Sequence, residues 1–384
     1  MFKLLGLLFL LPLSLFAQNT ITGKVISATS NRAVSEASVF LNNTVTGTKT
    51  STDGSFSLSN IQNGAYKIVV SCIGYEHYEK TIIVNGDIHL EDVKLIPKIT
   101  ELGEVKISAK KHSTPDLYLR IFTNEFLGQT KNARACKILN PGIIHFVYDS
   151  DNEKLTATTS DFLIIENKAL GYRIKYMLVS FSNDARWVRT SYTGISFFEQ
   201  MDSTNAQQLI WKKNRAETYQ NSSMHFLRAC ISSQLTEEGF TVWKVIRTPA
   251  SNRPTDSVVR ERINSLRDYP KASPELSKWL KIAKQPAYDQ KVGHTPPELY
   301  DYIKRTDQKG IYGFGFPFTL MINYHNAGNG SNRNSSFVTF VAPYAYFDSN
   351  GILFTPENCI IQGFWGDKRI GDLLPDDYKF PGGY

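Results

Sequence analysis

Residues 52–66, TDGSFSLSNIQNGAY, decide the fold of the N-terminal part of this chain. The stretch places a short run of alternating apolar and polar residues between two turns, Asp53-Gly54 and Asn63-Gly64. Such alternation is typical of a strand with one buried face. An Asp-Gly pair favours a tight hairpin, because both central residues of that turn need positive φ. We therefore interpret Asp53 as a turn residue of a β-structure.

The same pattern continues on both sides of this stretch. Seven runs with period-2 alternation, separated by Gly, Asn, Asp and Ser, fill residues 20–96: TITGKVIS, EASVFLN, TVTGTKTS, SFSLSN, AYKIVVSCI, EHYEKTIIV and IHLEDVKLI. Many short strands at close, regular spacing are typical of an antiparallel sandwich. The sequence predicts a seven-stranded β-sandwich over residues 18–98.

These runs resemble the carboxypeptidase regulatory-like domain, a small prealbumin-like β-sandwich. The resemblance is carried by Gly23, Val25, Ala37, Val39, Gly47, Thr52, Asp53, Gly54, Phe56, Leu58, Gly64, Tyr66, Ile73, Gly74 and Tyr75. It implies a non-catalytic accessory module of the kind that begins many exported envelope proteins. The module also precedes the plug of TonB-dependent transporters, but the remaining about 275 residues are too few for a barrel of 22 strands.

The chain opens MFKLLGLLFLLPLSLFAQNT, with one lysine, an apolar run and then Ala17. This order is that of a secretory signal peptide, and the apolar run is too short for a transmembrane span of about 20 residues. We predict a signal peptide over residues 1–17, cleavage near Ala17, and no transmembrane segment after cleavage. The expected location is the periplasm, the outer-membrane surface or the cell surface.

A linker over residues 99–113 and a larger antiparallel α+β domain over 114–384 are predicted next. A helix begins at Pro115, capped by Thr114, and ends at Gly128. An antiparallel meander follows, in the runs GIIHFVYD, EKLTATT, DFLIIEN, YRIKYMLVSF and RWVRTSYTGISFFEQM.

Two more helices follow the meander, over 206–219 and from Ser222 or Ser223 to Gly239. Residues 248–300 are rich in proline and charge, which indicates a surface excursion with one short helix, Pro274–Ala283. Strands return after it, and the tail is expected to pack through Leu373 and Leu374. The runs FLGQTKNARACKILNP, WKKNRAETYQNSSMHFLRA and LLPDDY resemble the region after this module in a family of exported proteins without an established activity.

The strongest polar cluster consists of Arg215, Tyr219, His225 and Arg228, around the turn YQNSS. His225 and Arg228 lie one turn apart near a helix N-terminus, where anions are favoured. One interpretation is an anion or carbohydrate pocket at a helix–sheet junction. The other is that the arginines fix the helix to the sheet edge through carbonyls and acids, and the frequency of such packing roles favours it.

The other motifs of the sequence do not indicate a catalytic or metal-binding site. Asp149, Asp151 and Glu153 alternate as at the start of a calcium loop but lack its glycine and distal glutamate, which favours a solvated turn. No His-x-x-Glu pair, HExxH helix or GxSxG elbow is present. The four cysteines have no CxxC pair, so we predict no metal or cofactor; a Cys136–Cys230 disulfide stays open.

The formal net charge of +7 is spread along the chain, which argues against a nucleic-acid groove. The sequence therefore predicts a non-enzymatic, exported cell-envelope protein that binds a protein or glycan partner. The alternative is an envelope hydrolase whose site is assembled from distant residues.

Overall fold

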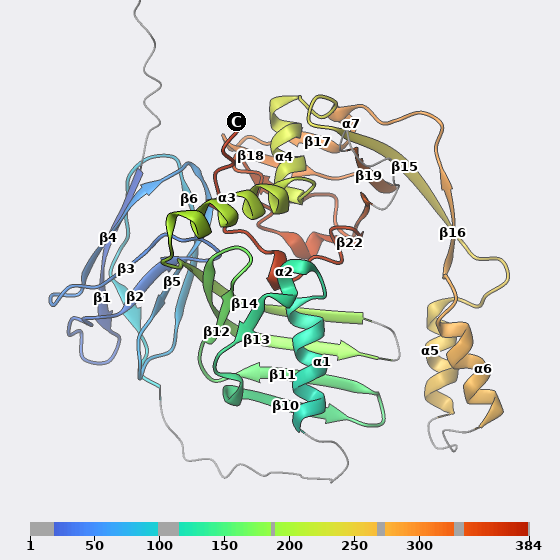
Figure 1. Cartoon of the computed structure of the whole chain (residues 1–384), viewed down its shortest axis with the longest axis horizontal. Helices are drawn as coiled ribbons and strands as arrows, with labels where there is room; N and C mark the ends of the chain where they lie inside the picture. Colours follow the sequence, from blue (N-terminus) through green and yellow to red (C-terminus); the bar gives the residue numbers. More distant parts are fainter. Residues whose placement is uncertain (1–18, 99–114, 186–188, 267–272, 326–333, 383–384) are drawn as a thin grey trace, which may run out of the picture.

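The computed structural model describes residues 19–98, 115–185, 189–266, 273–325 and 334–382 (Figure 1). Strands hold 41% of the residues and helices 23%, so the chain is mainly β, as predicted. A β-sandwich is followed by a larger part with several antiparallel sheets. The predicted signal peptide and linker lie outside the described residues.

The sandwich consists of two sheets that face each other. One has the strand order β4-β1-β7, with β8 also paired to β1, and the other has the order β3-β2-β5-β6. Its strands are β1 (Asn19–Ser27), β2 (Ser38–Leu41), β3 (Gly47–Lys49), β4 (Ser55–Ile61), β5 (Gly64–Ser71), β6 (Tyr78–Val84), β7 (Ile88–His89) and β8 (Val93–Leu95). The alternation in β4 buries Phe56 and Leu58, and an irregularity at Asn60, with φ 63°, lets Ile61 be buried as well.

The seventh predicted strand is divided into β7 and β8. Both pair in parallel with β1, where Ile21 faces Ile88 and Val25 faces Val93. The segment between β7 and β8 therefore has one residue more than the part of β1 beside it. This bulge interrupts the hydrogen-bond ladder with β1. The sandwich has eight strands for this reason.

The Asp53-Gly54 turn differs from the expected tight hairpin. Only Gly54 has positive φ, at +81°, and the turn carries the chain from β3 to β4, which belong to different sheets. A Cβ on Gly54 would lie 2.5 Å from the carbonyl oxygen of Val25, so glycine is required there. Asp53 accepts hydrogen bonds from Ser51 and Ser55, which supports the interpretation as a turn residue.

The second part begins with a sheet of order β10-β11-β13-β12-β9, with β14 paired to β13. Helix α1 lies across one face of this sheet, where the stacked rings of Phe122 and Phe126 join the core (Figure 1). Gly128, at φ +94°, follows α1 as predicted. The elements are α1 (Pro115–Leu127), α2 (Lys131–Arg134), β9 (Cys136–Ile138), η1 (Pro141–Ile143), β10 (Ile144–Asp149), β11 (Lys154–Thr159), β12 (Leu163–Asn167), β13 (Tyr172–Asp184) and β14 (Arg189–Gln200).

Helices α3 (Asn205–Tyr219) and α4 (Ser223–Ser232) follow, and the Ser222 hydroxyl caps α4 as one of the two predicted caps. The prediction that α4 runs to Gly239 is wrong. Ser233 adopts the left-handed conformation, with φ 57°, and its backbone N–H satisfies the last helical carbonyls. Gly239 instead supplies positive φ in the turn before the next strand.

The remaining strands form two sheets, of order β16-β15-β19-β20-β22 and β17-β18-β21. Their core surrounds Phe226, Phe240 and Trp365. The elements are β15 (Phe240–Pro249), α5 (Asp256–Ser265), α6 (Pro274–Ala283), β16 (Tyr288–Val292), α7 (Leu299–Tyr302), β17 (Ile303–Arg305), β18 (Ile311–Phe314), β19 (Thr319–Tyr324), β20 (Ser335–Phe340), β21 (Ala345–Asp348), η3 (Pro356–Asn358), β22 (Cys359–Gly363) and η4 (Ile370–Asp372).

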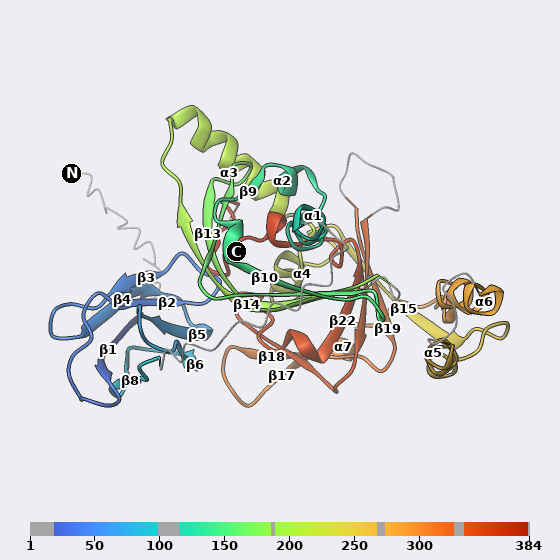
Figure 2. The same cartoon turned by 90° about the horizontal axis from the view of Figure 1, so that it is seen from below.

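The surface excursion predicted over residues 248–300 is a helical arm over residues 250–287, carried on the ends of β15 and β16 (Figures 1 and 2), whereas residues 288–292 form strand β16 of the sheet. Helix α6 has the predicted bounds, and α5 was not predicted because its sequence is strongly polar. Val259 and Ile263 of α5 are fully buried against Leu276 and Trp279 of α6, which gives the arm a small core of its own. We call residues 115–249 and 288–374 of the second part the body.

The sandwich is packed against the body. Phe40 and Val69 of the sandwich and Ile195 of β14 form one buried apolar cluster. Next to it, the backbone N–H of Asn43 donates to the carbonyl of Ser196, at 2.7 Å, and the N–H of Phe198 donates to the carbonyl of Thr44, at 2.9 Å. The sandwich and the body therefore share a specific interface, although the sequence that connects them is polar.

Candidate functional site

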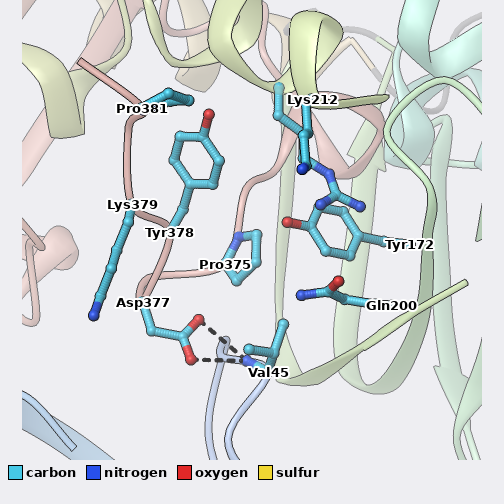
Figure 3. Close-up of a pocket in the computed structure, with 10 residues that line it drawn as sticks. Val45, Tyr172, Gln200, Lys212, Pro375, Asp377, Tyr378, Lys379 and Pro381 are labelled. Atoms are coloured by element: carbon cyan, nitrogen blue, oxygen red, sulfur yellow. Dashed lines mark hydrogen bonds between the residues drawn. The ribbon is translucent and has the colours of Figure 1, made fainter. Parts of the chain in front are cut away.

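A cavity of about 450 Å³ lies where three segments distant in sequence meet: the β2–β3 turn, the β13–β14–α3 region and the C-terminal tail, residues 375–381 (Figure 3). This volume lies within the range of about 300–1,000 Å³ of small-molecule sites. We call it the junction cavity, and its lining residues are Val45, Tyr172, Gln200, Lys212, Arg215, Pro375, Asp377, Tyr378, Lys379 and Pro381.

The sandwich holds the tail in place through two carboxylates. The Val45 N–H donates to both oxygens of Asp377, at 3.2 Å each, and the Thr46 hydroxyl donates to one of them, at 3.0 Å. The side-chain amide of Asn43 donates to Asp376, at 2.5 Å, and the Asp376 N–H donates back to the Asn43 carbonyl, at 2.7 Å. Burial raises the pKa of both carboxyls.

The opposite wall carries positive charge. The Arg215 guanidinium lies 3.9 Å from the ring centre of Tyr172 and donates to the carbonyls of Leu170, at 2.6 Å, and Gly171, at 3.1 Å. Burial lowers the pKa of Arg215. Lys212 lies three residues earlier on the same face of α3, and its ammonium points toward the space between Tyr172 and the tail (Figure 3).

Two phenols and an amide complete the walls. Burial raises the pKa of Tyr172 and of Tyr378 to about 12, so both hydroxyls are neutral at pH 7. The Gln200 side chain points into the cavity from the end of β14 (Figure 3). The lining residues include no serine, cysteine or histidine and a single carboxylate, Asp377. This arrangement suits binding of a molecule with both a ring face and polar substituents.

The structure places one of the four predicted site residues in the wall of the cavity and the other three outside it. Arg215 lines the cavity. Tyr219 is fully buried and stacks on Phe380 of the tail, with ring centres 4.8 Å apart. Arg228 donates to the carbonyls of Asn350, at 2.8 Å, and Tyr378, at 3.1 Å. Both arginines thus bind backbone carbonyls, while ligand binding by the four residues stays a prediction.

His225 is enclosed at the start of α4, with 3% of its surface exposed. Its Nδ1 accepts a hydrogen bond from the Asn221 N–H, so the proton lies on Nε2, which is 2.9 Å from a carboxylate oxygen of Glu238. Burial lowers the pKa of His225, against the opposing effect of Glu238. A neutral imidazole in this position fixes the helix start to the turn before β15.

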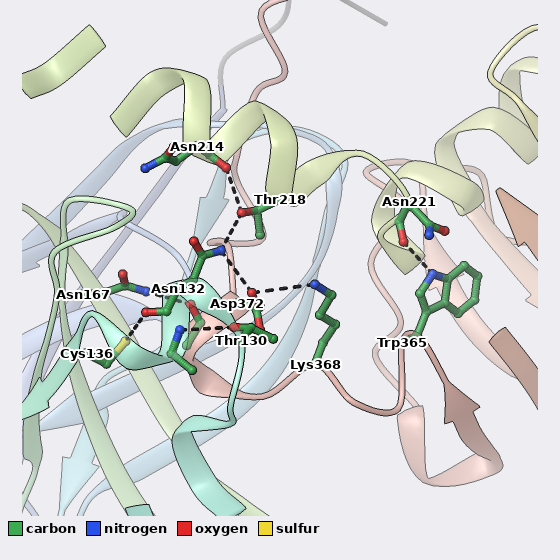
Figure 4. Close-up of polar contacts among 12 residues, drawn as sticks. Thr130, Asn132, Cys136, Asn167, Asn214, Thr218, Asn221, Trp365, Lys368 and Asp372 are labelled. Carbon is green, nitrogen blue, oxygen red and sulfur yellow. Dashed lines mark hydrogen bonds and ion pairs between the residues drawn. The ribbon is translucent and has the colours of Figure 1, made fainter. Parts of the chain in front are cut away.

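The segment that leads into the tail is fixed by a buried carboxylate, Asp372 (Figure 4). The Thr130 hydroxyl donates to it at 2.8 Å, the Asn132 amide donates at 3.0 Å, and the Lys368 ammonium lies 3.7 Å away. Leu373 packs against the core and Leu374 is buried in it, as predicted. The tail therefore leaves the body at a fixed point before it reaches the junction cavity.

Sequence reasoning did not identify Tyr172, Gln200, Lys212, Asp377 or Tyr378 as neighbours. They come from β13, β14, α3 and the tail. The spacing of residues within one segment does not show that these four segments lie side by side in the fold. The one signal within reach was the i, i+3 spacing of Lys212 and Arg215, which places two cations on one helix face.

The remaining candidates are structural. Asp149 accepts hydrogen bonds from the N–H groups of Asp151 and Asn152 in the β10–β11 turn, as the solvated-turn interpretation predicts. Cys136 and Cys230 are free thiols in different cores. Across the described ranges, no group of three or more His, Cys, Asp or Glu residues has the arrangement of a metal site. No helix of the described ranges is long and apolar enough to cross a membrane.

Comparison with known families places the first part of the chain. Residues 21–107 match the family model of the CarboxypepD_reg-like domain. This match confirms the resemblance predicted for the N-terminal sandwich and extends past residue 98. No curated protein matches the chain.

Solved structures show weaker likenesses. A DUF3823 family protein from Parabacteroides merdae is 11% identical, over 50% of this chain and 85% of its own, with a TM-score of 0.18. A putative membrane-associated protein from Bacteroides fragilis is 11% identical, over 86% and 94%, with a TM-score of 0.17. A cohesin–X-dockerin complex from Acetivibrio cellulolyticus is 17% identical, over 20% of this chain and 56% of the other, with a TM-score of 0.19. Such TM-scores carry no argument about function.

Proposed function

We propose that this protein is an exported, non-enzymatic binding protein of the cell envelope, and that its junction cavity binds a glycan. The observation that carries this proposal is the composition of the cavity. Its wall presents the ring of Tyr378 together with the Gln200 amide and the Lys212 ammonium, and the Tyr172 ring lies beneath the Arg215 guanidinium. Aromatic faces with adjacent donors are suited to a sugar ring and its hydroxyl groups.

Binding is favoured over hydrolysis by the state of the carboxylates. A glycosidase needs two carboxyl groups on either side of the scissile bond. Among the described residues that line the cavity, Asp377 alone carries a carboxylate, and its oxygens accept hydrogen bonds from Val45 and Thr46. No other acid among the lining residues completes a pair, so a binding role fits the cavity better than the alternative of an envelope hydrolase.

The test is a binding screen of the mature protein against soluble fragments of envelope polysaccharides, with product analysis of each mixture. We expect saturable binding and unchanged glycans. The variant Gln200→Trp, which fills the cavity from an exposed position, should abolish binding, whereas Gln208→Trp, on the exposed face of α3, should not. New reducing ends that require the protein would favour the hydrolase instead, and no binding to any fragment would contradict the proposal.

Export is part of the same proposal, supported by the leader sequence and the family match of the N-terminal module. Mass spectrometry of the protein from fractionated cells should find a mature N-terminus near Gln18. An intact Met1 in that fraction would contradict export through a cleaved signal peptide.

A further inference from the structure

The junction cavity carries an excess of positive charge. Lys212, Arg215 and Lys379 line it, against the single carboxylate of Asp377. Asp377 already receives three hydrogen bonds from the sandwich turn, and the Lys379 side chain extends along the tail away from Tyr172 (Figure 3). The cations that face the centre of the cavity are therefore those of α3.

The charge of Arg215 is not balanced by an acid. Its guanidinium is half-buried, and the groups that it contacts are the carbonyls of Leu170 and Gly171 and the ring of Tyr172. No carboxylate of the described residues forms an ion pair with it. A cation held in partly dry surroundings by neutral dipoles attracts an anion more strongly than a fully solvated cation does.

Lys212 adds a second positive charge at the rim. It is exposed, it follows the buried Trp211 on α3, and no hydrogen bond or ion pair to another described residue engages its ammonium. The next residue, Lys213, instead lies 3.8 Å from Glu217 and is 77% exposed. Two adjacent lysines of one helix therefore have different roles, because only Lys212 reaches the cavity.

From this arrangement we propose that the ligand of the junction cavity is an acidic monosaccharide unit, with its anionic group bound between Lys212 and Arg215. The sugar ring lies against Tyr378, and its hydroxyl groups bind the Gln200 amide. This inference rests on the proposed glycan-binding function and adds the charge of the ligand. Bidentate or paired cationic donors recognise carboxylate and phosphate groups alike, so both kinds of acidic sugar fall within the proposal.

The experiment measures binding of glucuronate, glucose 6-phosphate, glucose, and free acetate and phosphate to the mature full-length protein by calorimetry. We expect at least one acidic sugar to bind at least about tenfold more tightly than glucose, since one charge-assisted contact is worth about that factor. Added salt should weaken binding of the acidic sugar, because the pair lies at the rim of the cavity. Lys212→Met should lose this preference, and Lys213→Met should keep it.

The outcomes separate the two proposals. Equal binding of glucose and the acidic sugars, or equal loss in both lysine variants, overturns the acidic-ligand inference and leaves glycan binding intact. Acetate or phosphate that binds as tightly as the sugars overturns the saccharide part. If no sugar of this panel binds while neutral polysaccharide fragments do, the inference fails alone. If no glycan of either set binds, both proposals fail.

Discussion

The sandwich and the helical arm are both additions to the body with cores of their own, yet they are attached in different ways. The sandwich contributes Phe40 and Val69 to a cluster shared with Ile195, and its β2–β3 turn binds the C-terminal tail. The contacts that fix the arm lie within it, such as the ion pair of Arg262 with Glu275. A module boundary in a sequence therefore says little about whether the module is independent.

The largest effect should come from the apolar cluster between sandwich and body. Phe40 is 4% exposed and lies 5.1 Å from the ring centre of Phe197. Phe40→Ala should lower the free energy of unfolding by about 3–5 kcal/mol, the usual cost of removing a buried aromatic ring. Calorimetry should then resolve a separate sandwich transition. Ile73→Ala, at a fully exposed residue, is the control. An unchanged single transition in Phe40→Ala would mean that the cluster does not couple the two parts.

The second prediction tests whether the sandwich folds alone. We expect residues 18–98 to give a β-type circular dichroism spectrum in isolation. Gly54→Val should destabilise that fragment by about 2–4 kcal/mol, because strain at positive φ adds to a collision with the Val25 carbonyl. Gly74→Val, where φ is also positive but space is open, should cost less. An unfolded fragment with the wild-type sequence would show that the sandwich depends on the body, and the predicted boundary at residue 98 would be wrong.

Alternation of apolar residues was enough to predict the sandwich and the meander, because each residue's burial follows its place on a strand. The interface had no such signal. Asn43 and Asp376 are 333 residues apart, and a turn and a tail have no period from which to predict their meeting. Helix α5 was not predicted because most of its residues are polar. Its buried apolar residues, Val259 and Ile263, pack against α6, and two such residues are too few to indicate an amphipathic helix. Of the residues that line the junction cavity, the sequence analysis named only Arg215.

The third prediction concerns how the body holds the tail. Arg228 donates to the carbonyls of Asn350 and Tyr378. Arg228→Ala should lower the free energy of unfolding by about 1–3 kcal/mol, because these two carbonyls lose a charged hydrogen-bond donor. Denaturant melts measure this loss, and Arg120→Ala, at an exposed residue of α1, is the control. A variant with wild-type stability that no longer binds a wild-type ligand would instead make Arg228 part of a binding site.

The fourth prediction is a pH dependence of the interface. Burial raises the pKa of Asp376 well above its ordinary value, and the nearby charge of Asp348 acts in the same direction. The folded protein therefore keeps this proton to higher pH than the unfolded chain does. The contribution of this carboxyl to the free energy of unfolding is complete below the unfolded pKa, about 3.9, and is lost as pH rises from there through the folded value.

Asp376→Asn should reduce that fall, because the amide oxygen still accepts from Asn43 but does not ionise. Urea melts between pH 5 and 8 measure the slope at each pH. Asp53→Asn serves as control, since hydrogen bonds from Ser51 and Ser55 lower the pKa of Asp53 and it is ionised in both states over this range. A slope that Asp376→Asn leaves unchanged would contradict the assignment.

The smallest effect is expected from removal of the arm. The Ala250 N–H donates to the Ala287 carbonyl at 3.1 Å, so the chain ends that remain after deletion are already a bonded pair. Replacement of residues 251–286 by an Asn-Gly turn, which suits a two-residue hairpin, should change the stability of the body by less than about 0.5 kcal/mol. The apolar residues of the arm pack on each other, so their loss leaves no cavity in the cores of the body. Calorimetry on the deletion variant, beside Phe40→Ala, measures the contrast directly. A loss of several kcal/mol would show that the arm, like the sandwich, stabilises the body. The two additions would then differ in their contacts and not in their effect on stability.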